Sequence, residues 1–187
     1  MDAKIQLTPS KDKLKINETY TVAVLVTPGS VGIAGLQMDL KYNPASVRID
    51  SVVSGPFLWA ENYFNNGTPG VGVIKDIYGV STRPDAVATA PGVFVVLNCT
   101  ALAPGKSDFA LERVLVGSKE AVALPFVWSA NQVLCLSGFD LSGDGSVELS
   151  DLELAADRFG LAGEADFDGD GAVSVLDLIL VVRNFTL

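Results

Sequence analysis

The sequence predicts an all-β sandwich at residues 1–136, followed by a small module of two loop–helix repeats at residues 137–187. Three observations predict this division. Short apolar segments of strand type fill the first part, an acidic pattern of twelve residues occurs twice in the second part, and the two parts differ in charge. With 187 residues, 49% of them hydrophobic, the chain is long and apolar enough to bury a real core.

Eight segments of the first part alternate between apolar and polar residues or are continuously apolar and rich in β-branched residues. They lie at residues 19–26, 33–42, 46–53, 70–80, 92–102, 109–117, 123–129 and 132–136. Clusters of Pro, Gly, Asn and Asp separate them and predict turns at residues 27–30, 42–46, 65–70, 81–92 and 103–108. Eight or nine short strands without a helical pattern predict an antiparallel sandwich.

The charges are distributed unevenly along the chain. Residues 1–135 contain eleven acidic and eleven basic residues, whereas residues 136–187 contain eleven acidic residues against Arg158 and Arg183 alone. The whole net charge of −9 therefore lies in the second module. A pI near 4.4 argues against nucleic acid as a partner, because the polyanion would be repelled.

The sequence has no membrane-spanning or signal segment. No apolar run approaches the roughly 20 residues that a membrane span needs. The first ten residues lack the charged and then apolar pattern of a signal peptide, which leaves a cytoplasmic protein or an exported chain without its signal. Cys99 and Cys135 both fall within predicted strands, where packing as free apolar side chains is favoured over a disulfide bond.

Twelve residues, DLSGDGSVELSD, open the second module at Asp140. Counted from Asp140, the acidic and hydroxyl side chains stand at positions 1, 3, 5 and 12 of a loop, with Gly145 at position 6. This is the spacing of an EF-hand loop, which binds calcium through side-chain oxygens at positions 1, 3, 5 and 12 and a backbone carbonyl at position 7. The expected ligands are Asp140, Ser142, Asp144, Ser146 through its carbonyl, and Asp151.

The same pattern recurs 26 residues later, at DFDGDGAVSVLD. An apolar stretch with helical spacing follows each loop, at residues 152–160 and 178–185. Two such loops in tandem predict two calcium ions, of which the first is held more weakly because Ser142 replaces a carboxylate. The expected ligands of the second ion are Asp166, Asp168, Asp170, Ala172 through its carbonyl, and Asp177.

The duplicated loop and helix resemble a dockerin, the calcium-binding module that attaches enzymes to the scaffold proteins of cellulosomes. Aspartate at position 12 and the lack of a helix before the first loop both fit this resemblance. Dockerins of well-studied cellulosomes carry a hydroxyl pair at loop positions 10 and 11 and basic residues further along the helix. This chain instead has Leu149 and Ser150, Val175 and Leu176 at positions 10 and 11, and Ala156, Asp157, Val182 and Arg183 beyond. The four residues at positions 10 and 11 are the expected partner contacts.

The first module resembles a cohesin, the partner of dockerins. Residues 31–55 resemble the cohesin segment in which a strand ends in a Tyr-Asn-Pro turn, and residues 92–118 resemble a later strand with its Ala-Pro-Gly turn. The resemblance implies a jelly-roll sandwich of about nine strands without catalytic activity, one sheet face of which binds a dockerin. The alternation places Phe94 and Val96 outward on a neighbouring strand. The expected contacts are Gly35, Gln37, Asp39, Lys41, Phe94 and Val96.

Two other classes of protein remain open. An enzyme is disfavoured because the chain has no histidine and because its sandwich acids are scattered rather than paired as a glycosidase requires. A carbohydrate-binding module that carries a dockerin shares the sandwich fold. Its sugar platform would consist of aromatic residues, namely Trp59, Tyr63, Phe64, Tyr78 and Trp128.

The interpretation favoured by the sequence is a non-catalytic, calcium-dependent adaptor, located outside the cell or on its surface, in assemblies that degrade polysaccharides. Its expected partners are proteins that bear a dockerin or a cohesin. The junction CLSGFD is short, so the modules are expected to abut. Because the expected recognition residues of familiar dockerins are replaced, the chain is expected to be a monomer on its own.

Overall fold

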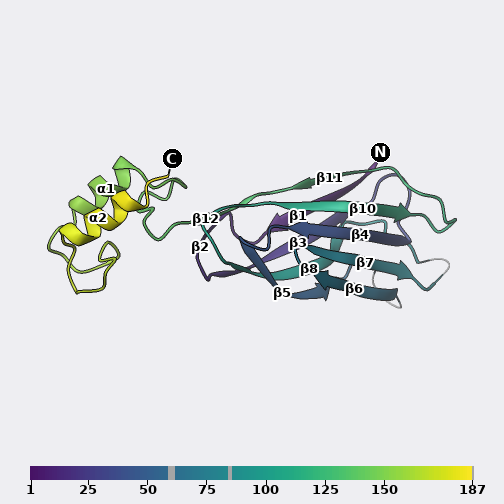
Figure 1. Ribbon diagram of the computed structural model, residues 1–187. Helices are drawn as coiled ribbons and strands as arrows, with labels where there is room; N and C mark the ends of the chain where they lie inside the picture. Colours follow the sequence, from purple (N-terminus) through teal and green to yellow (C-terminus); the bar gives the residue numbers. More distant parts are fainter. Residues whose placement is uncertain (59–61, 84–85, 187) are drawn as a thin grey trace.

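The structure is a computed structural model that describes residues 1–58, 62–83 and 86–186. It shows a β-sandwich with a small helical module at one end (Figure 1). A five-stranded sheet has the order β11-β1-β3-β8-β5 and a four-stranded sheet the order β10-β4-β7-β6. The strands of the first sheet, in that order, are Phe126–Ala130, Ala3–Pro9, Thr19–Thr27, Gly92–Ala101 and Val47–Ser54. Those of the second are Phe109–Gly117, Gly35–Tyr42, Val73–Ser81 and Asn62–Gly70.

A three-stranded sheet closes the end of the sandwich that faces the helices. It consists of β2 (Lys13–Lys15), β12 (Val133–Leu136) and β9 (Gly105–Ser107), in that order. β12 pairs in parallel with β2, and β1 pairs in parallel with β11. The sandwich was expected to be antiparallel, and these two pairings depart from that expectation. β12 ends at Leu136, where the chain leaves the sandwich (Figure 1).

The described chain contains twelve strands rather than the expected eight or nine. β2 and β9 are three residues long, too short to show a period. β6 runs through residues 65–70, for which a turn is predicted. It is an edge strand paired only with β7, and this position tolerates Pro69, whose nitrogen has no hydrogen to donate.

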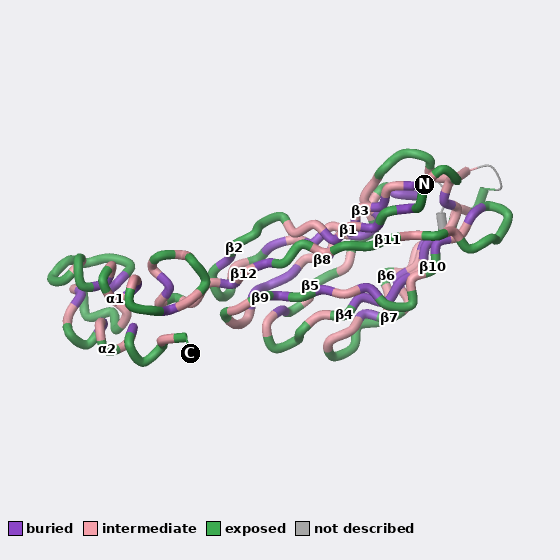
Figure 2. The backbone as a smooth tube through the Cα atoms, turned by 90° about the horizontal axis from the view of Figure 1, so that it is seen from above, coloured by how far each residue is buried: buried purple, intermediate pink, exposed green. Residues whose placement is uncertain are grey.

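The core lies between the five-stranded and four-stranded sheets, where buried residues form one cluster (Figure 2). In β3 every second side chain is buried, from Tyr20 to Val26, as the alternation predicts. Cys99 and Cys135 are buried in this core as free thiols. Their apolar packing agrees with the preference drawn from the sequence.

β8 departs from simple alternation because it contains a bulge. Val24 of β3 pairs with Val95, whereas Leu25 pairs with Val93, so Phe94 is an extra residue in its strand. The bulge turns Phe94 into the core, where its ring lies edge-on to Phe64 at a centroid distance of 5.4 Å. The prediction that Phe94 points outward is therefore wrong.

The second module packs two helices around a small apolar cluster of its own. The helices are α1 (Leu149–Ala156) and α2 (Val175–Arg183), and the buried members of the cluster are Val147, Ala155, Ala165, Val173 and Val181. The rings of Phe139 and Phe167 lie 4.8 Å apart beside it. In the described part of the chain, no helix has the length and apolar character to cross a membrane.

Candidate metal centre and partner-binding face

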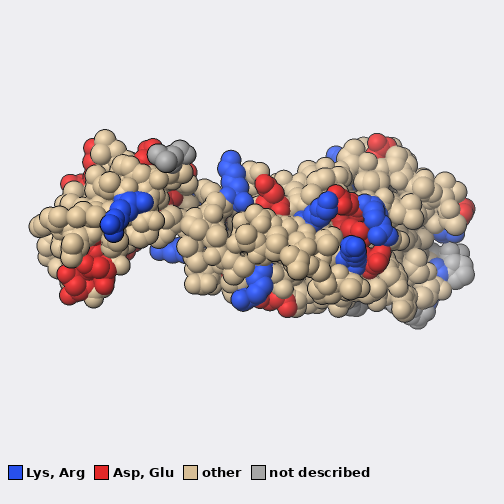
Figure 3. Space-filling model, in the orientation of Figure 1, with Lys and Arg blue, Asp and Glu red and all other residues tan. Residues whose placement is uncertain are grey.

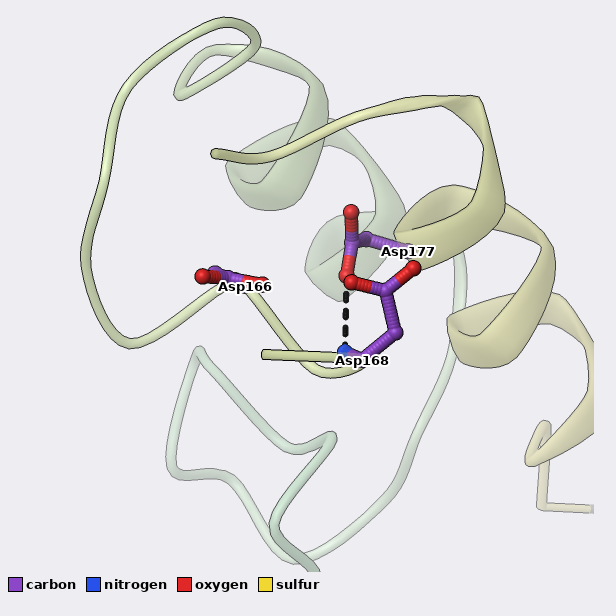
Figure 4. A group of neighbouring side chains, drawn as sticks. All are labelled: Asp166, Asp168 and Asp177. Carbon is purple, nitrogen blue, oxygen red and sulfur yellow. Dashed lines mark hydrogen bonds between the residues drawn. The ribbon is translucent and has the colours of Figure 1, made fainter. Parts of the chain in front are cut away.

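Three carboxylates converge in the second acidic loop (Figure 4). Asp166, Asp168 and Asp177 each present an oxygen atom within 4.8 Å of the other two. Asp166 and Asp168 come from the start of the loop, and Asp177 comes from the first turn of α2. The geometry thus brings together positions 1, 3 and 12 of the predicted ligand set.

Backbone N–H groups hold the closing carboxylate in place. Oδ1 of Asp177 accepts hydrogen bonds from the N–H groups of Phe167 and Asp168, at 2.7 and 3.1 Å. Its Oδ2 accepts from Ser174, the residue that caps α2, at 2.7 Å. These bonds tie both ends of the loop to the helix and fix the orientation of a fully buried carboxylate.

The loop glycines provide the other anchors. The N–H groups of Gly169 and Gly171 each donate to a different oxygen of Asp166, both at 2.9 Å. Gly171 has a φ of +106°, a conformation that is strained for a residue with a side chain, so glycine at position 6 permits this turn. Asp168 and Asp170 in turn accept from the N–H groups of Asp170 and Ala172, both at 3.1 Å.

The first loop repeats this arrangement. Asp151 accepts from the N–H groups of Ser142 and Glu148, both at 2.8 Å, and is fully buried. Asp140 accepts from Gly143 and Gly145, at 2.7 and 2.9 Å. Asp144, the ligand expected at position 5, accepts from the N–H of Ser146 at 2.8 Å, as Asp170 accepts from Ala172 in the second loop.

The loops differ at position 3. Among the described residues, the three-carboxylate cluster occurs only in the second loop, because Ser142 stands where that loop has Asp168. The Ser142 hydroxyl instead donates to Oδ1 of Asp140 at 3.2 Å. The first loop therefore brings fewer negative charges to its centre.

The local electrostatics of the second loop reflect its crowded carboxylates. A hydrogen bond from the Ser174 N–H, supported by those from Asp168 and Phe167, lowers the pKa of Asp177 below its ordinary value. The pKa of Asp168 is raised. A hydrogen bond from the Asp170 N–H opposes the rise, but burial and the neighbouring carboxylates of Asp170, Asp177 and Asp166 outweigh it. A bound cation would relieve this repulsion.

The donor set suits calcium. Each loop offers several carboxylate oxygens, and seven-coordinate calcium takes hard oxygen ligands of this kind, including the position 7 carbonyls of Ser146 and Ala172. The described donors include no histidine or thiolate, which would favour zinc or copper instead.

On the sandwich, three of the four residues predicted on one strand reach the open face of the four-stranded sheet. Gly35 and Gln37 are half-buried and Lys41 is exposed on β4. Figure 3 shows charged side chains of both signs gathered on an otherwise largely uncharged face. On the same sheet, Lys41 of β4 and Glu112 of β10 form an ion pair at 2.7 Å, and both are exposed.

Asp39 was predicted to be a partner contact on this face, but its side chain is not available there. Its side chain is covered, because a guanidinium nitrogen of Arg113 lies 3.3 Å from its Oδ2 and the Asp76 N–H donates to its Oδ1 at 2.9 Å. Arg113 and Asp76 have left-handed φ angles of +48° and +56°. Near Asp39, the pairing of β4 with β10 and its pairing with β7 each contain a register shift. The two irregularities turn these residues over Asp39, an effect that strand alternation does not reveal.

Phe94 and Val96 do not belong to this face. β8 lies in the five-stranded sheet and is not a neighbour of β4. Phe94 is buried in the core, and Val96 is half-buried. The prediction assumed that the two strands were adjacent, and the sequence carries no direct signal of sheet order.

Sequence reasoning also missed an apolar groove at the end of the same face. The groove has a volume of about 640 Å³ and lies between β4, β7, β10 and the segment after β10. Its apolar lining includes Tyr78, Val80, Leu115 and Val122, and the last three of these side chains are largely exposed. Alternation gives no signal for it, because Leu115 has the same parity as the buried Phe109 and Leu111 in β10. A pairing irregularity after Glu112 moves Leu115 to the outward side, and one in β7 does the same for Val80.

The remaining expected contacts lie on the helical module. Leu149, Val175 and Leu176 are exposed and Ser150 is half-exposed, each at the start of its helix. Ile179 and Val182 extend the exposed apolar surface along α2.

The predicted sugar platform does not assemble as one surface from its described members. Tyr63 and Tyr78 stack at a centroid distance of 5.9 Å on the four-stranded sheet. Phe64 packs into the core against Phe94, and Trp128 lies on β11 of the other sheet. Trp59 lies outside the described residues.

Comparison with known proteins reveals similarity in structure alone. No protein-family model and no curated protein sequence matches the chain. Among the solved structures, a type II cohesin module from the adaptor scaffoldin of Acetivibrio cellulolyticus has a TM-score of 0.61 at 11% identity, with 71% of this chain and 96% of that chain covered. A non-cellulosomal cohesin from Archaeoglobus fulgidus has a TM-score of 0.59 at 10% identity, with 73% and 93% covered.

A chain from a type I cohesin–dockerin complex of Clostridium thermocellum also has a TM-score of 0.59, at 13% identity, with 73% of this chain and all of that chain covered. These matches are to cohesin modules of about the size of the sandwich. The N-terminal sandwich has the cohesin fold.

Proposed function

We propose that the chain is a non-catalytic adaptor that binds protein partners through both modules. The observation that carries this proposal is the cohesin fold of the sandwich, because several similar structures are described as cohesin–dockerin complexes. The partner of the sandwich is then a dockerin, bound on the open face formed by β10, β4, β7 and β6. The exposed apolar groove on that face, with Val80 and Leu115 in its lining, supports this location.

The second module acts as a dockerin that requires two calcium ions. Two loops with equivalent hydrogen bonds, each closed by a buried aspartate at the start of a helix, support this assignment. Bound calcium would neutralise the carboxylates of each loop. The chain's own residues orient those carboxylates and present Leu149, Ser150, Val175 and Leu176 to a cohesin partner.

The setting proposed for this adaptor is extracellular or at the cell surface, in assemblies that degrade polysaccharides. Extracellular calcium is abundant enough to load sites of modest affinity. The chain is a monomer by itself in this proposal, and its modules serve foreign partners. Light scattering over a range of concentrations in calcium tests this, since a mass that rises with concentration would indicate head-to-tail assembly.

Calorimetric titration of the full chain with a panel of dockerin modules tests the role of the sheet face. At least one dockerin is expected to bind with a stoichiometry of one. Leu115→Asp places a charge in the groove and should abolish that binding. Val53→Asp is the matched control, because Val53 is about equally exposed, at 49% against 53% for Leu115, but lies on β5 of the opposite sheet. Equal binding by both variants would locate the partner elsewhere.

Carbohydrate binding is the second candidate, and the stacked pair of Tyr63 and Tyr78 favours it, since Tyr63 is exposed. Retention of the full chain on insoluble polysaccharide, lost in Tyr63→Ala, would support this function. The adaptor proposal predicts no retention.

A further inference from the structure

The first acidic loop touches the end of the sandwich. Nζ of Lys13, on β2, donates a hydrogen bond to the carbonyl oxygen of Gly143, at position 4 of this loop. The two residues are 130 positions apart in sequence and belong to different modules. Figure 1 shows that β2 and β12 lie at the end of the sandwich that the helical module faces.

Apolar packing accompanies this hydrogen bond. A methyl group on Gly145, at position 6 of the loop, would lie 2.8 Å from Cδ2 of Leu134 on β12. The backbone of the loop is therefore pressed closely against a sandwich side chain. Leu134 pairs directly with Lys13 across the β2–β12 ladder, so both contacts come from one spot on the sandwich.

The second loop supplies an internal comparison. Gly171 occupies its position 6, yet no described atom lies within 4 Å of a methyl group placed on it. Position 4 is open in both loops by this measure, so the packing contact with the sandwich is specific to Gly145. Both loops close through the same hydrogen bonds, with Asp140 matching Asp166 and Asp151 matching Asp177. The contacts with the sandwich therefore distinguish two loops that close through the same hydrogen bonds.

The connection between the modules is also ordered. The Asp140 N–H donates to the Ser137 carbonyl at 3.2 Å, and the Phe139 N–H donates to the Ser137 hydroxyl at 3.3 Å. Phe139 then packs against the core of the helical module. Little free chain remains between β12 and the first loop, so movement of the loop moves the whole module.

We propose that the first loop is the joint between the two modules, and that calcium in this loop fixes their relative orientation whereas calcium in the second loop does not. This inference rests on the calcium binding proposed above. The closed form of the first loop is the form that presents the Gly143 carbonyl to Lys13 and the Gly145 backbone to Leu134. A cation that holds Asp140, Asp144 and Asp151 together stabilises that form, and by linkage the docked sandwich stabilises the bound cation.

The consequence for function is a fixed angle between two binding surfaces. The helical surface around Leu149 and Val175 would keep one orientation relative to the open sheet face while the first site is loaded. Lys13 and Leu134 are positioning residues in this arrangement, since they contact the loop but supply no expected ligand atom.

Nitrogen-15 relaxation of the full chain in calcium tests the joint, together with calorimetric counting of bound calcium. The wild-type modules should share one rotational correlation time. Asp151→Asn, in the first loop, should give the helical module a shorter time of its own, whereas Asp177→Asn, in the second loop, should leave the shared time unchanged. Lys13→Met combined with Leu134→Ala should also uncouple the modules, while two calcium ions still bind.

The double variant should weaken calcium binding at the first site about fivefold or more, by the same linkage, and leave the second site unchanged. Lys75→Met with Val53→Ala is the control, since Lys75 is exposed on β7 and Val53 on β5, both away from the β2–β12 ladder. It should change neither property. This control also separates a local contact from a general loss of charge and apolar surface.

A shared correlation time that persists in the double variant would overturn the joint, as would uncoupling by Asp177→Asn to the same degree as by Asp151→Asn. Two bound calcium ions with independent tumbling of the wild-type modules would overturn the joint alone and leave the proposed function standing. An absence of calcium binding would remove both.

Discussion

The backbone N–H of Asp168 donates a hydrogen bond to Oδ1 of Asp177 at 3.1 Å, so positions 3 and 12 of the second loop are held side by side (Figure 4). In the first loop, the Ser142 N–H donates the equivalent hydrogen bond to Oδ1 of Asp151 at 2.8 Å. Backbone N–H groups thus orient the aspartates of each loop, and in the second loop they hold oxygen atoms of Asp166, Asp168 and Asp177 within 4.8 Å of one another. This arrangement places like charges together, and for that reason we expect the module to depend on a cation.

Removal of calcium is expected to unfold the helical module and to spare the sandwich. Among the described residues, the helical module buries five apolar residues in its cluster, whereas the sandwich buries twenty-seven. So small a core does not offset the repulsion of the loop carboxylates. Addition of a chelator should remove the helical signal in far-UV circular dichroism and leave one melting transition, that of the sandwich. A spectrum that does not respond to the chelator would contradict this.

Thr186 is expected to support the first calcium site. Its hydroxyl accepts a hydrogen bond from the Val147 N–H at 2.9 Å, and its own N–H donates to the Val147 carbonyl at 2.8 Å. Thr186→Val removes that acceptor from a partly buried N–H, at a cost of about 1 kcal/mol, since Thr186 itself is exposed. Calorimetry should show weaker binding at the first site alone, because Val173 of the second loop pairs with Gly160 and Leu161 instead. Equal weakening at both sites would contradict the assignment.

Asp50 makes the stability of the sandwich sensitive to acid. A hydrogen bond from the Thr100 hydroxyl, together with one from Arg48, lowers the pKa of Asp50 below 3.8. A carboxylate with a lowered pKa in the folded state stabilises the protein above its unfolded pKa, and this contribution is lost as the pH falls through the folded value.

Thr100→Val should therefore reduce the free energy of unfolding by about 1 kcal/mol near neutral pH, a value reduced for solvent screening. The difference from wild type should shrink below pH 3.8, as Asp50 becomes protonated in the unfolded state. Urea titrations across pH, with calcium withheld, measure this. Thr68→Val, on an exposed edge strand, is the control and should show no such dependence. A constant difference at all pH values would refute the role of Asp50.

The buried thiols are expected to be unreactive in the folded protein. Burial, and secondarily the nearby Asp50 carboxylate, raises the pKa of Cys99 to about 12, and burial also raises the pKa of Cys135. Because the thiolate is the reactive form, a thiol reagent at pH 8 should label neither residue until the sandwich is unfolded in urea. Rapid labelling of two thiols in the native protein would contradict the packing described above.

The sequence predicts the repeated local features well and the long-range ones poorly. The spacing of Asp166, Asp168 and Asp177 predicted that these residues act together, since the chemistry lies within twelve neighbouring positions. β3 was predictable for a similar reason, because its alternation is regular from Tyr20 to Val26.

Errors arose where bulges and sheet order decide the outcome. One extra residue in β8 reversed the orientation predicted for Phe94, and two irregularities beside β4 covered Asp39 with Arg113. Neither feature has a local sequence signature. The contact between Lys13 and Gly143 joins residues from opposite ends of the chain, which periodicity does not detect.

The most direct measurement for the account is a calorimetric calcium titration of the full chain beside three variants. The wild type should bind two ions, and Asp151→Asn and Asp177→Asn should each lose the ion of their own loop or weaken its binding by tenfold or more, about the loss seen when metal-site support is removed. Glu153→Gln removes an exposed carboxylate of α1 outside the ligand set and should bind as wild type does. No heat of binding in the wild type, or an equal loss in all three variants, would contradict the assignment of the two loops as calcium sites.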